Sequence, residues 1–159
     1  MCVSAQTAVF ESDMIGWCQT PDGYSRDEPQ SFMNKTANGA PIILLLHDIE
    51  ETRDGIEKLL IVDGYRVDAV RYENDAVATA QRRDPNLIMV NLGGLPAEVI
   101  AAGRRIRKSA QLTEDVPVVI FCIDSVEEGD EIDLGSNLYV TRPDNFNQLR
   151  SFLRRLLGL

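Results

Sequence analysis

The stretch IILLLHDIEETRDGIEKLLIVDGYRVDAV, residues 42–70, contains three successive patterns. Ile42 to Leu46 is a short apolar run, typical of a strand that is buried on both faces. From Glu50 to Val62 the apolar residues return at helical spacing, and Asp63-Gly64 ends that pattern. Tyr65 to Val70 alternates as a second strand does. A strand, a helix and a strand in this order predict two parallel strands joined by a right-handed crossover.

The same alternation continues along the chain. We expect further strands over Leu87–Val90, Val116–Phe121 and Leu138–Val140, and further helices over Asp75–Arg83, Pro96–Lys108 and Asp144–Leu157. The acidic stretch Val126–Leu134, which Gly129 interrupts, predicts a short, weak helix. Five strands that alternate with five helices predict an α/β fold. We expect a flavodoxin-like, doubly wound parallel sheet with strand order 2-1-3-4-5.

The apolar residues also predict which side of each helix is buried. In the first helix we expect Ile56, Leu59, Leu60 and Val62 on one side, and in the third Val99, Ile100 and Ile106 facing inward. The basic residues of the third helix are expected to be a solvated face: Arg104, Arg105, Arg107 and Lys108. The terminal helix has an apolar stripe of Phe146, Leu149, Phe152, Leu153 and Leu156.

Composition excludes several functional classes. The chain has 159 residues and a net charge of −9, which argues against nucleic acid or an anionic membrane as a partner. No apolar run approaches the roughly 20 residues that span a bilayer, and no secretory signal is recognisable, so we expect a cytoplasmic protein. The three cysteines form no metal-binding motif. Because the chain has a single histidine, most zinc sites and Ser-His-Asp catalytic triads are excluded. Neither a G-x-G-x-x-G motif nor a P-loop follows the first strand, so dinucleotide and nucleoside-triphosphate binding are not predicted.

Residues 1–40 lack sustained periodicity and contain several turn signals. We expect a flexible N-terminal extension there, followed by one domain over residues 41–159. A small apolar group, Met14, Ile15 and Trp17, favours a docking segment as the alternative role of the extension.

Polar residues gather where the predicted strands end. Ligands of this architecture lie at the carboxyl ends of the first and third strands, where the strand order reverses. His47 and Asp48 follow the first strand, and Asn91 ends the third. Cys122 ends the fourth strand and Arg142 follows the fifth. These five residues are therefore the candidate site.

Residues 41–159 resemble the receiver domain of bacterial response regulators. The resemblance rests on the order and spacing of ILLLHDIEETRDGIEKLL, DGYRV, DPNLIMVNL, VPVVIFC and YVTRP, followed by the amphipathic last helix. It implies an acidic pair after the first strand that holds magnesium, and an aspartate at the end of the third that becomes phosphorylated. It also implies a Ser or Thr after the fourth strand and a Lys-Pro after the fifth, both of which contact the phosphoryl group.

This sequence departs from that pattern at nearly every functional position. His47-Asp48 stands at the acidic pair, Asn91 at the phosphoacceptor, Cys122 at the hydroxyl and Arg142 at the lysine. An amide has no anionic oxygen with which to attack phosphorus, so Asn91 should not form an acyl phosphate. Magnesium prefers anionic oxygen ligands, and only Asp48 remains of three. We therefore expect no cofactor, and magnesium binding that is lost or weak.

The individual residues allow more than one role. His47 is read as a partly exposed loop histidine, with a metal ligand or pH sensor as the alternative. Asp48 would form a salt bridge with Arg142, cap the following helix or retain weak cation binding. Asn91 would form hydrogen bonds between Asp48 and Arg142, or bond to backbone groups of the neighbouring loops. Cys122 is expected to be a small buried hydrophobe. We hypothesise a cleft locked in one conformation without metal or phosphorylation.

The function predicted from these residues is that of a stand-alone pseudo-receiver, not an enzyme, that acts through protein contacts in a signalling pathway. Its partner would be a histidine kinase or another regulator, and a homodimer through the helix 4–strand 5–helix 5 face is a further expectation. Tyr139 and the acidic segment before it are the preferred docking site. Two alternatives stay open, namely a phosphorelay receiver that uses Asp48 as acceptor and a small-ligand sensor.

Overall fold

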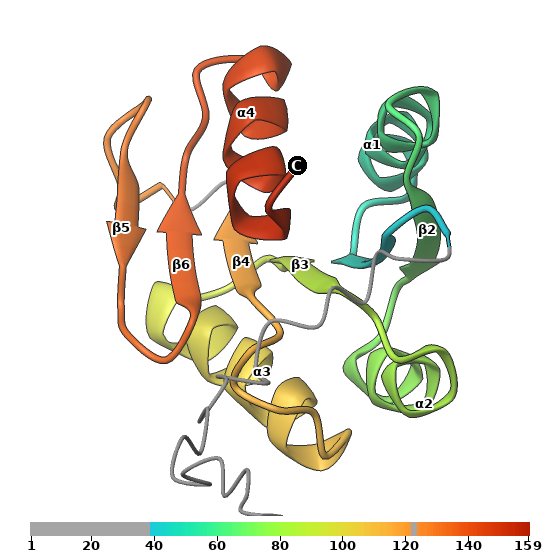
Figure 1. Ribbon diagram of the computed structural model, residues 1–159. Coiled ribbons are helices and arrows are strands. Elements are labelled where there is room, and N and C mark those ends of the chain that lie inside the picture. The colour runs from blue at the N-terminus through green and yellow to red at the C-terminus, as the bar shows by residue number, and fades with distance from the viewer. Residues whose placement is uncertain (1–38, 122–123) are drawn as a thin grey trace, which may run out of the picture. The chain divides into compact units, whose positions relative to one another are not determined.

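The chain forms one six-stranded sheet with helices on both faces (Figure 1). The computed structural model describes residues 39–121 and 124–159. The strands are β1 (Ile42–His47), β2 (Arg66–Val70), β3 (Leu87–Asn91), β4 (Val118–Phe121), β5 (Glu131–Asp133) and β6 (Leu138–Thr141). The helices are α1 (Glu50–Val62), α2 (Glu73–Arg83), α3 (Pro96–Ser109) and α4 (Phe146–Leu157).

The strand order β2-β1-β3-β4-β6-β5 confirms the predicted doubly wound sheet. The five predicted strands are parallel and lie in the predicted order, with β6 as the fifth of them. Each predicted strand and helix is present within two residues of its expected bounds, except the helix expected over 126–134. The predicted N-terminal extension lies outside the described residues apart from its last two, so the proposed domain boundary stays a prediction.

The prediction of a weak helix before the last strand was wrong. That segment contains β5, which pairs antiparallel with β6 and adds an edge to the sheet. The turn between them is built from Gly135, Ser136 and Asn137, which all have positive φ. Asp133 Oδ1 accepts the Gly135 N–H at 2.7 Å and so fixes the start of the turn. Gly, Ser and Asn at these positions favour a hairpin over a helix.

The sheet separates two apolar layers. Strand residues alternate between its faces, so that Leu44, Ile88 and Val118 lie on one side and Ile43, Met89 and Val119 on the other. The first layer packs against α2 and α3, and the second against α1 and α4 (Figure 1). The central strands β1, β3 and β4 are buried on both faces, as their continuous apolar runs predict.

Helix α3 lies close against β4 and β6 because Gly103 faces them. A Cβ at Gly103 would lie 2.9 Å from Ile120 Cδ1 and 3.0 Å from Val118 Cγ1, which is too close for any side chain. The glycine therefore lets α3 cover the face of β4 and β6.

Arg107, on the same helix, was predicted to point into solvent and is instead buried. Its Nη1 donates to Ser136 O at 2.6 Å and to Val116 O at 3.3 Å. Its apolar stem lies against the sheet side of α3 while its charged end serves backbone carbonyls, which is the usual way to bury an arginine. The side chain thus joins α3 to the start of β4 and to the hairpin turn.

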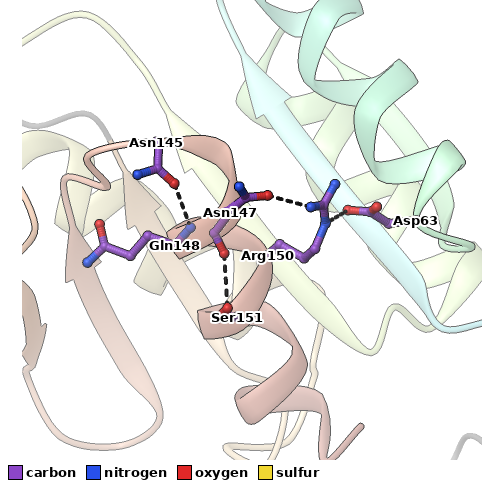
Figure 2. A network of polar contacts seen from close by, with 6 residues as sticks. All are labelled: Asp63, Asn145, Asn147, Gln148, Arg150 and Ser151. Carbon is purple, nitrogen blue, oxygen red and sulfur yellow. Dashed lines mark hydrogen bonds and ion pairs between the residues drawn. The ribbon is translucent and has the colours of Figure 1, made fainter.

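Helices α1 and α4 are joined by polar contacts (Figure 2). Arg150 on α4 donates through Nε to Asp63 Oδ2 at 2.7 Å, at the carboxyl end of α1, and through Nη1 to Asn147 Oδ1 at 2.6 Å. Asn145 caps α4 by accepting the Gln148 N–H at 3.1 Å. The apolar stripe predicted for α4 is confirmed, because Leu149, Phe152 and Leu153 are buried and Phe146 and Leu156 pack beside them.

The inward face predicted for α1 is only partly confirmed. Leu60 is buried and Ile56 packs beside it, but Leu59 is 43% exposed and Val62 is 83% exposed. Within the described ranges, none of the helices combines the length and apolar character that a bilayer-spanning segment needs.

Candidate functional site

The polar ends of β1 and β3 meet at one edge of the sheet. His47 and Asn91 are the last residues of their strands and lie directly opposite each other in the parallel register. A cleft of about 660 Å³ opens beside them. Its walls are formed by His47, Asp48, Ile49, Thr52, Asn91, Leu92, Gly93, Gly94, Pro96, Val99, Asp124 and Ser125. Three predicted site residues, His47, Asp48 and Asn91, are therefore brought together where the strand order predicted.

His47 is a buried core histidine, and the prediction that it is partly exposed was wrong. Its exposed fraction is 1%, and its ring packs edge-on against Phe121 with 6.1 Å between centroids. Nδ1 accepts the Ile49 N–H at 3.1 Å. Burial lowers the pKa of the imidazole below 6.5, nearby Asp48 opposes this, and Arg53 adds to it. His47 is therefore neutral at physiological pH.

The hydrogen bonds of His47 determine how Asn91 is held. A neutral imidazole has one N–H, and Nδ1 is already an acceptor, so the proton lies on Nε2. The structure places the amide nitrogen of Asn91, Nδ2, 3.2 Å from Nε2. With the proton on Nε2, the amide must turn its oxygen toward the ring in order to accept it. The strand ends are thus joined by two neutral groups that satisfy each other.

Asp48 is the most accessible of the three residues, with a side chain that is 41% exposed. Its Oδ2 accepts the Gly93 N–H at 2.8 Å, and its Oδ1 lies 3.6 Å from His47 Nδ1. Asp48 does not cap α1, whose N-cap is Ile49 without a side-chain hydrogen bond. A Cβ on Gly93 would lie 3.1 Å from Asp48 Oδ2, so the carboxylate occupies the space that a side chain would need.

Arg142 does not pair with Asp48, which corrects the predicted salt bridge. Its Nη1 donates to Val126 O at 3.4 Å, and its backbone oxygen accepts the Gly129 N–H at 2.7 Å. Arg142 follows β6, which is three strand spacings from β1 in the sheet, or about 14 Å. The side chain therefore holds the segment that leads into β5 and leaves the charge of Asp48 unmatched by an arginine among the described residues.

Tyr139 lies away from the cleft. Its ring packs edge-on against Phe152 of α4 at 5.7 Å, and its hydroxyl donates to Asn137 Oδ1 at 2.9 Å. Cys122 lies outside the described residues, so its predicted burial stays a prediction. The candidate site therefore consists of the three residues at the ends of β1 and β3, with Arg142 and Tyr139 serving the β5–β6 hairpin and α4.

Three polar residues of the cleft wall were not singled out from the sequence. Thr52 lies in the first turn of α1, and Asp124 and Ser125 follow β4. All three lie within five residues of the carboxyl end of β1 or β4, and that position was the signal that would have found them.

The cleft is a poor match for magnesium. The two nitrogens of His47 and the carboxamide of Asn91 are committed to each other and to Ile49, and they carry no negative charge. In the part of the chain that the structure describes, no three His, Cys, Asp or Glu side chains are grouped closely enough to hold a metal ion. Magnesium binds through anionic oxygens, and the described cleft wall supplies two carboxylates, those of Asp48 at the end of β1 and of Asp124 after β4.

The sheet order, the two helical layers and the cleft at the ends of β1 and β3 define a protein with the receiver fold. The receiver domain of the sensor histidine kinase PA1611 of Pseudomonas aeruginosa PAO1 is similar, with a TM-score of 0.57 and 28% identity over 76% of this chain and all of that one. The chemotaxis protein CheY4 of Vibrio cholerae has a TM-score of 0.56 and 16% identity, over 74% of this chain and 99% of that one.

A chain in the complex of histidine kinase ThkA with response regulator protein TrrA has a TM-score of 0.57 and 19% identity, over 74% of this chain and 98% of that one. No family model and no curated protein matches the sequence. The structural neighbours are thus receiver domains of response regulators and of a sensor kinase, and they share their fold with this chain.

Proposed function

We propose that this protein is a signalling domain of the kind found in bacterial two-component systems, and that it acts through protein contacts without taking up a phosphoryl group. The observation that carries the proposal is the His47–Asn91 pair. The resemblance to receivers puts a carboxylate at both positions, and here both are neutral and bonded to each other.

Chemistry supports this reading. A phosphoacceptor needs an anionic oxygen with a free lone pair. The Asn91 amide has a delocalised nitrogen and a neutral oxygen, and its carboxamide lies against the ring of His47. A magnesium ion would find only two carboxylates on the described cleft wall, those of Asp48 and Asp124. We propose that magnesium binds weakly or not at all and that the domain has no catalytic activity of its own.

The proposed docking surface is formed by β5, β6 and α4. It replaces the predicted helix 4–strand 5–helix 5 face, because a strand stands where a helix was expected. One similar structure holds histidine kinase ThkA in complex with response regulator protein TrrA, which favours a kinase or another regulator as partner. A homodimer through this face also stays a prediction. Neither nucleic acid nor a membrane is proposed, given the net charge of −9.

Incubation with acetyl phosphate and magnesium, followed by intact-mass measurement, tests the proposal. The mass should not change, whereas a receiver of known activity treated in parallel should gain a phosphoryl group. A phosphoryl group on Asp48 would overturn the proposal and establish the alternative of a substitute acceptor, which the exposure of this side chain favours. The Asp48→Asn variant identifies the acceptor, because it would abolish such a gain.

The cleft volume of about 660 Å³ favours a second candidate function, the sensing of a small ligand. A ligand that binds the folded state raises the melting temperature. Thermal scans of the protein against a panel of small polar metabolites therefore test this candidate. A Gly93→Leu variant, whose side chain would enter the cleft beside Asp48, should lose any stabilisation that comes from this site.

A pull-down compares the full chain with a chain that begins at Ala40. Capture of the same partner by both would place the contact in residues 40–159. Capture by the full chain alone would assign the docking role to the N-terminal extension.

A further inference from the structure

The two outermost strands of the described sheet lie in surroundings of opposite charge. β2 and β5 are its outermost strands, and each has one side on which no described strand pairs with it (Figure 1). Such an edge presents free backbone N–H and C=O groups that can bind another strand. The two edges therefore differ from the rest of the surface in offering a template for association.

The edge at β2 forms a basic groove. Two adjoining hollows of about 530 and 510 Å³ lie along β2 and α2 and share Ala69, Val70, Thr79 and Arg82. Four arginines line this groove, against two aspartates: Arg53, Arg71, Arg82 and Arg83, with Asp68 and Asp75. A surplus of positive charge is unusual on a chain whose net charge is −9.

Part of that charge is available to a partner. Arg83 pairs with Asp68 at 3.4 Å. Arg71 lies over the Tyr72 ring, 5.4 Å from its centroid, and forms no ion pair within the described residues. Arg82 is exposed and likewise forms neither an ion pair nor a hydrogen bond there. Two guanidinium groups are thus free to bind carboxylates.

The edge at β5 is acidic. Glu131 and Asp133 belong to the strand, and Glu127, Glu128 and Asp130 precede it; all five are exposed. Glu131 pairs with Arg155 of α4, and Asp133 Oδ1 accepts the Gly135 N–H, so the carboxylates of Glu127 and Glu128 are the freer ones. Charge on an edge strand often prevents association, but that protection works between edges of like sign. Here one edge is basic and the other is acidic.

We propose that the basic groove at β2 of one copy binds the acidic edge at β5 of a second copy. The contact would combine attraction between the charges with strand addition to an open sheet edge. It joins two different surfaces of the same chain, so a bound pair of copies leaves one groove and one acidic edge free. Such head-to-tail contacts produce open chains of molecules unless the geometry closes a ring. This inference does not depend on any chemistry in the cleft, and its acidic edge lies within the docking surface proposed for a partner.

Sedimentation velocity on the full chain tests the contact. The weight-average mass should rise with protein concentration at low salt and return toward the monomer in about 0.5 M salt, because ions screen exposed charges. Arg71→Glu/Arg82→Glu should remain monomeric, and so should Glu127→Lys/Glu128→Lys. Lys108→Glu and Glu114→Lys carry charge changes on exposed residues of other elements and should associate as the unmodified protein does.

Mixing the two blocked variants gives the decisive result. The arginine variant keeps its acidic edge and the glutamate variant keeps its basic groove, and their two reversed surfaces are also of opposite charge. An equimolar mixture should therefore associate at low salt although neither variant associates alone. A protein that stays monomeric at low salt would overturn the proposal. So would association that survives Arg71→Glu/Arg82→Glu but not Glu127→Lys/Glu128→Lys, which would indicate a symmetric dimer or another contact through the β5 face. Circular dichroism of each variant checks that it is folded.

Discussion

His47 and Asn91 end neighbouring parallel strands, face each other in register, and lie 3.2 Å apart through Nε2 and the carboxamide. Neither group carries a charge when His47 is neutral, and burial favours that state. A cleft built around such a pair differs from one built around carboxylates, because it has no repulsion that a cation must relieve. The hypothesis of a cleft locked without metal keeps its support from this pair, although the predicted partner Arg142 takes no part.

The first prediction concerns the ionisation of His47. It is the only histidine in the chain, so an NMR titration gives a single imidazole signal whose midpoint should lie below pH 6.5. Asn91→Asp should raise that pKa, because a carboxylate next to Nε2 stabilises the imidazolium ion. Asn74→Asp adds the same charge on the exposed side of α2 and should leave the titration unchanged. A midpoint at or above 6.5 in the unmodified protein would contradict the burial argument.

The second prediction concerns how the free energy of unfolding depends on pH. The folded state holds His47 with a pKa below the 6.5 of an exposed histidine, so the unfolded chain binds the proton more readily. The stabilising contribution is therefore complete above about pH 6.5 and is lost as the pH falls toward the lower folded pKa. Urea unfolding between about pH 8 and pH 5 measures this slope. His47→Gln, which cannot titrate, should lose the corresponding part of it.

The third prediction rebuilds an acidic site. His47→Asp/Asn91→Asp would place two carboxylates beside Asp48, and this trio should bind magnesium measurably by calorimetry. The same variant should be less stable without metal, because like charges then lie close together. Adding Asp48→Asn to the double variant should weaken magnesium binding. Equal binding with and without Asp48 would show that the ion lies elsewhere.

The fourth prediction compares two helical glycines. Gly55 in α1 is exposed, and a Cβ there would touch nothing within 4 Å, so Gly55→Ala should stabilise the fold by about 0.5–1 kcal/mol. A Cβ at Gly103 in α3 would lie 2.9 Å from Ile120 Cδ1 and 3.0 Å from Val118 Cγ1, so Gly103→Ala should destabilise the fold by about 1–3 kcal/mol. Chemical denaturation of both variants measures the difference. Effects of the same sign would mean that α3 does not approach the sheet as closely as described.

The fifth prediction concerns the buried Arg107. Arg107→Ala removes the donor that serves Ser136 O and Val116 O, and should cost about 2 kcal/mol in the free energy of unfolding. Arg104, on the same helix, is exposed. Arg104→Ala should change stability by no more than about 0.5 kcal/mol. If both variants behaved alike, the two carbonyls would have another source of hydrogen bonds.

The sequence was sufficient for the sheet order and for the grouping of His47, Asp48 and Asn91, because strand periodicity and chain order determine which strand ends meet. It was not sufficient for the burial of His47, since a residue at the end of a strand lies inside or outside depending on packing from other elements. The salt bridge of Asp48 with Arg142 was inferred from charge alone, without the distance that two intervening strands impose.

The hairpin was missed for a local reason. The acidic residues and Gly129 suggested a weak helix, while the turn chemistry of Gly135, Ser136 and Asn137 was overlooked. Arg107 was assigned to solvent because of its charge, although a long stem allows an arginine to be buried when carbonyls receive its guanidinium.

The bridge made by Arg107 also bears on how the molecule opens. Its Nη1 donates to the Val116 carbonyl, just before β4, and to the Ser136 carbonyl, in the β5–β6 turn, so one side chain binds both segments to α3. Local unfolding of α3 therefore breaks hydrogen bonds to the start of β4 and to the β5–β6 turn, and unfolding of the turn breaks one to α3. In native-state hydrogen exchange, the amides of α3 and of the β5–β6 hairpin should therefore lose protection together, as one cooperative unit, although about 30 residues of chain separate them.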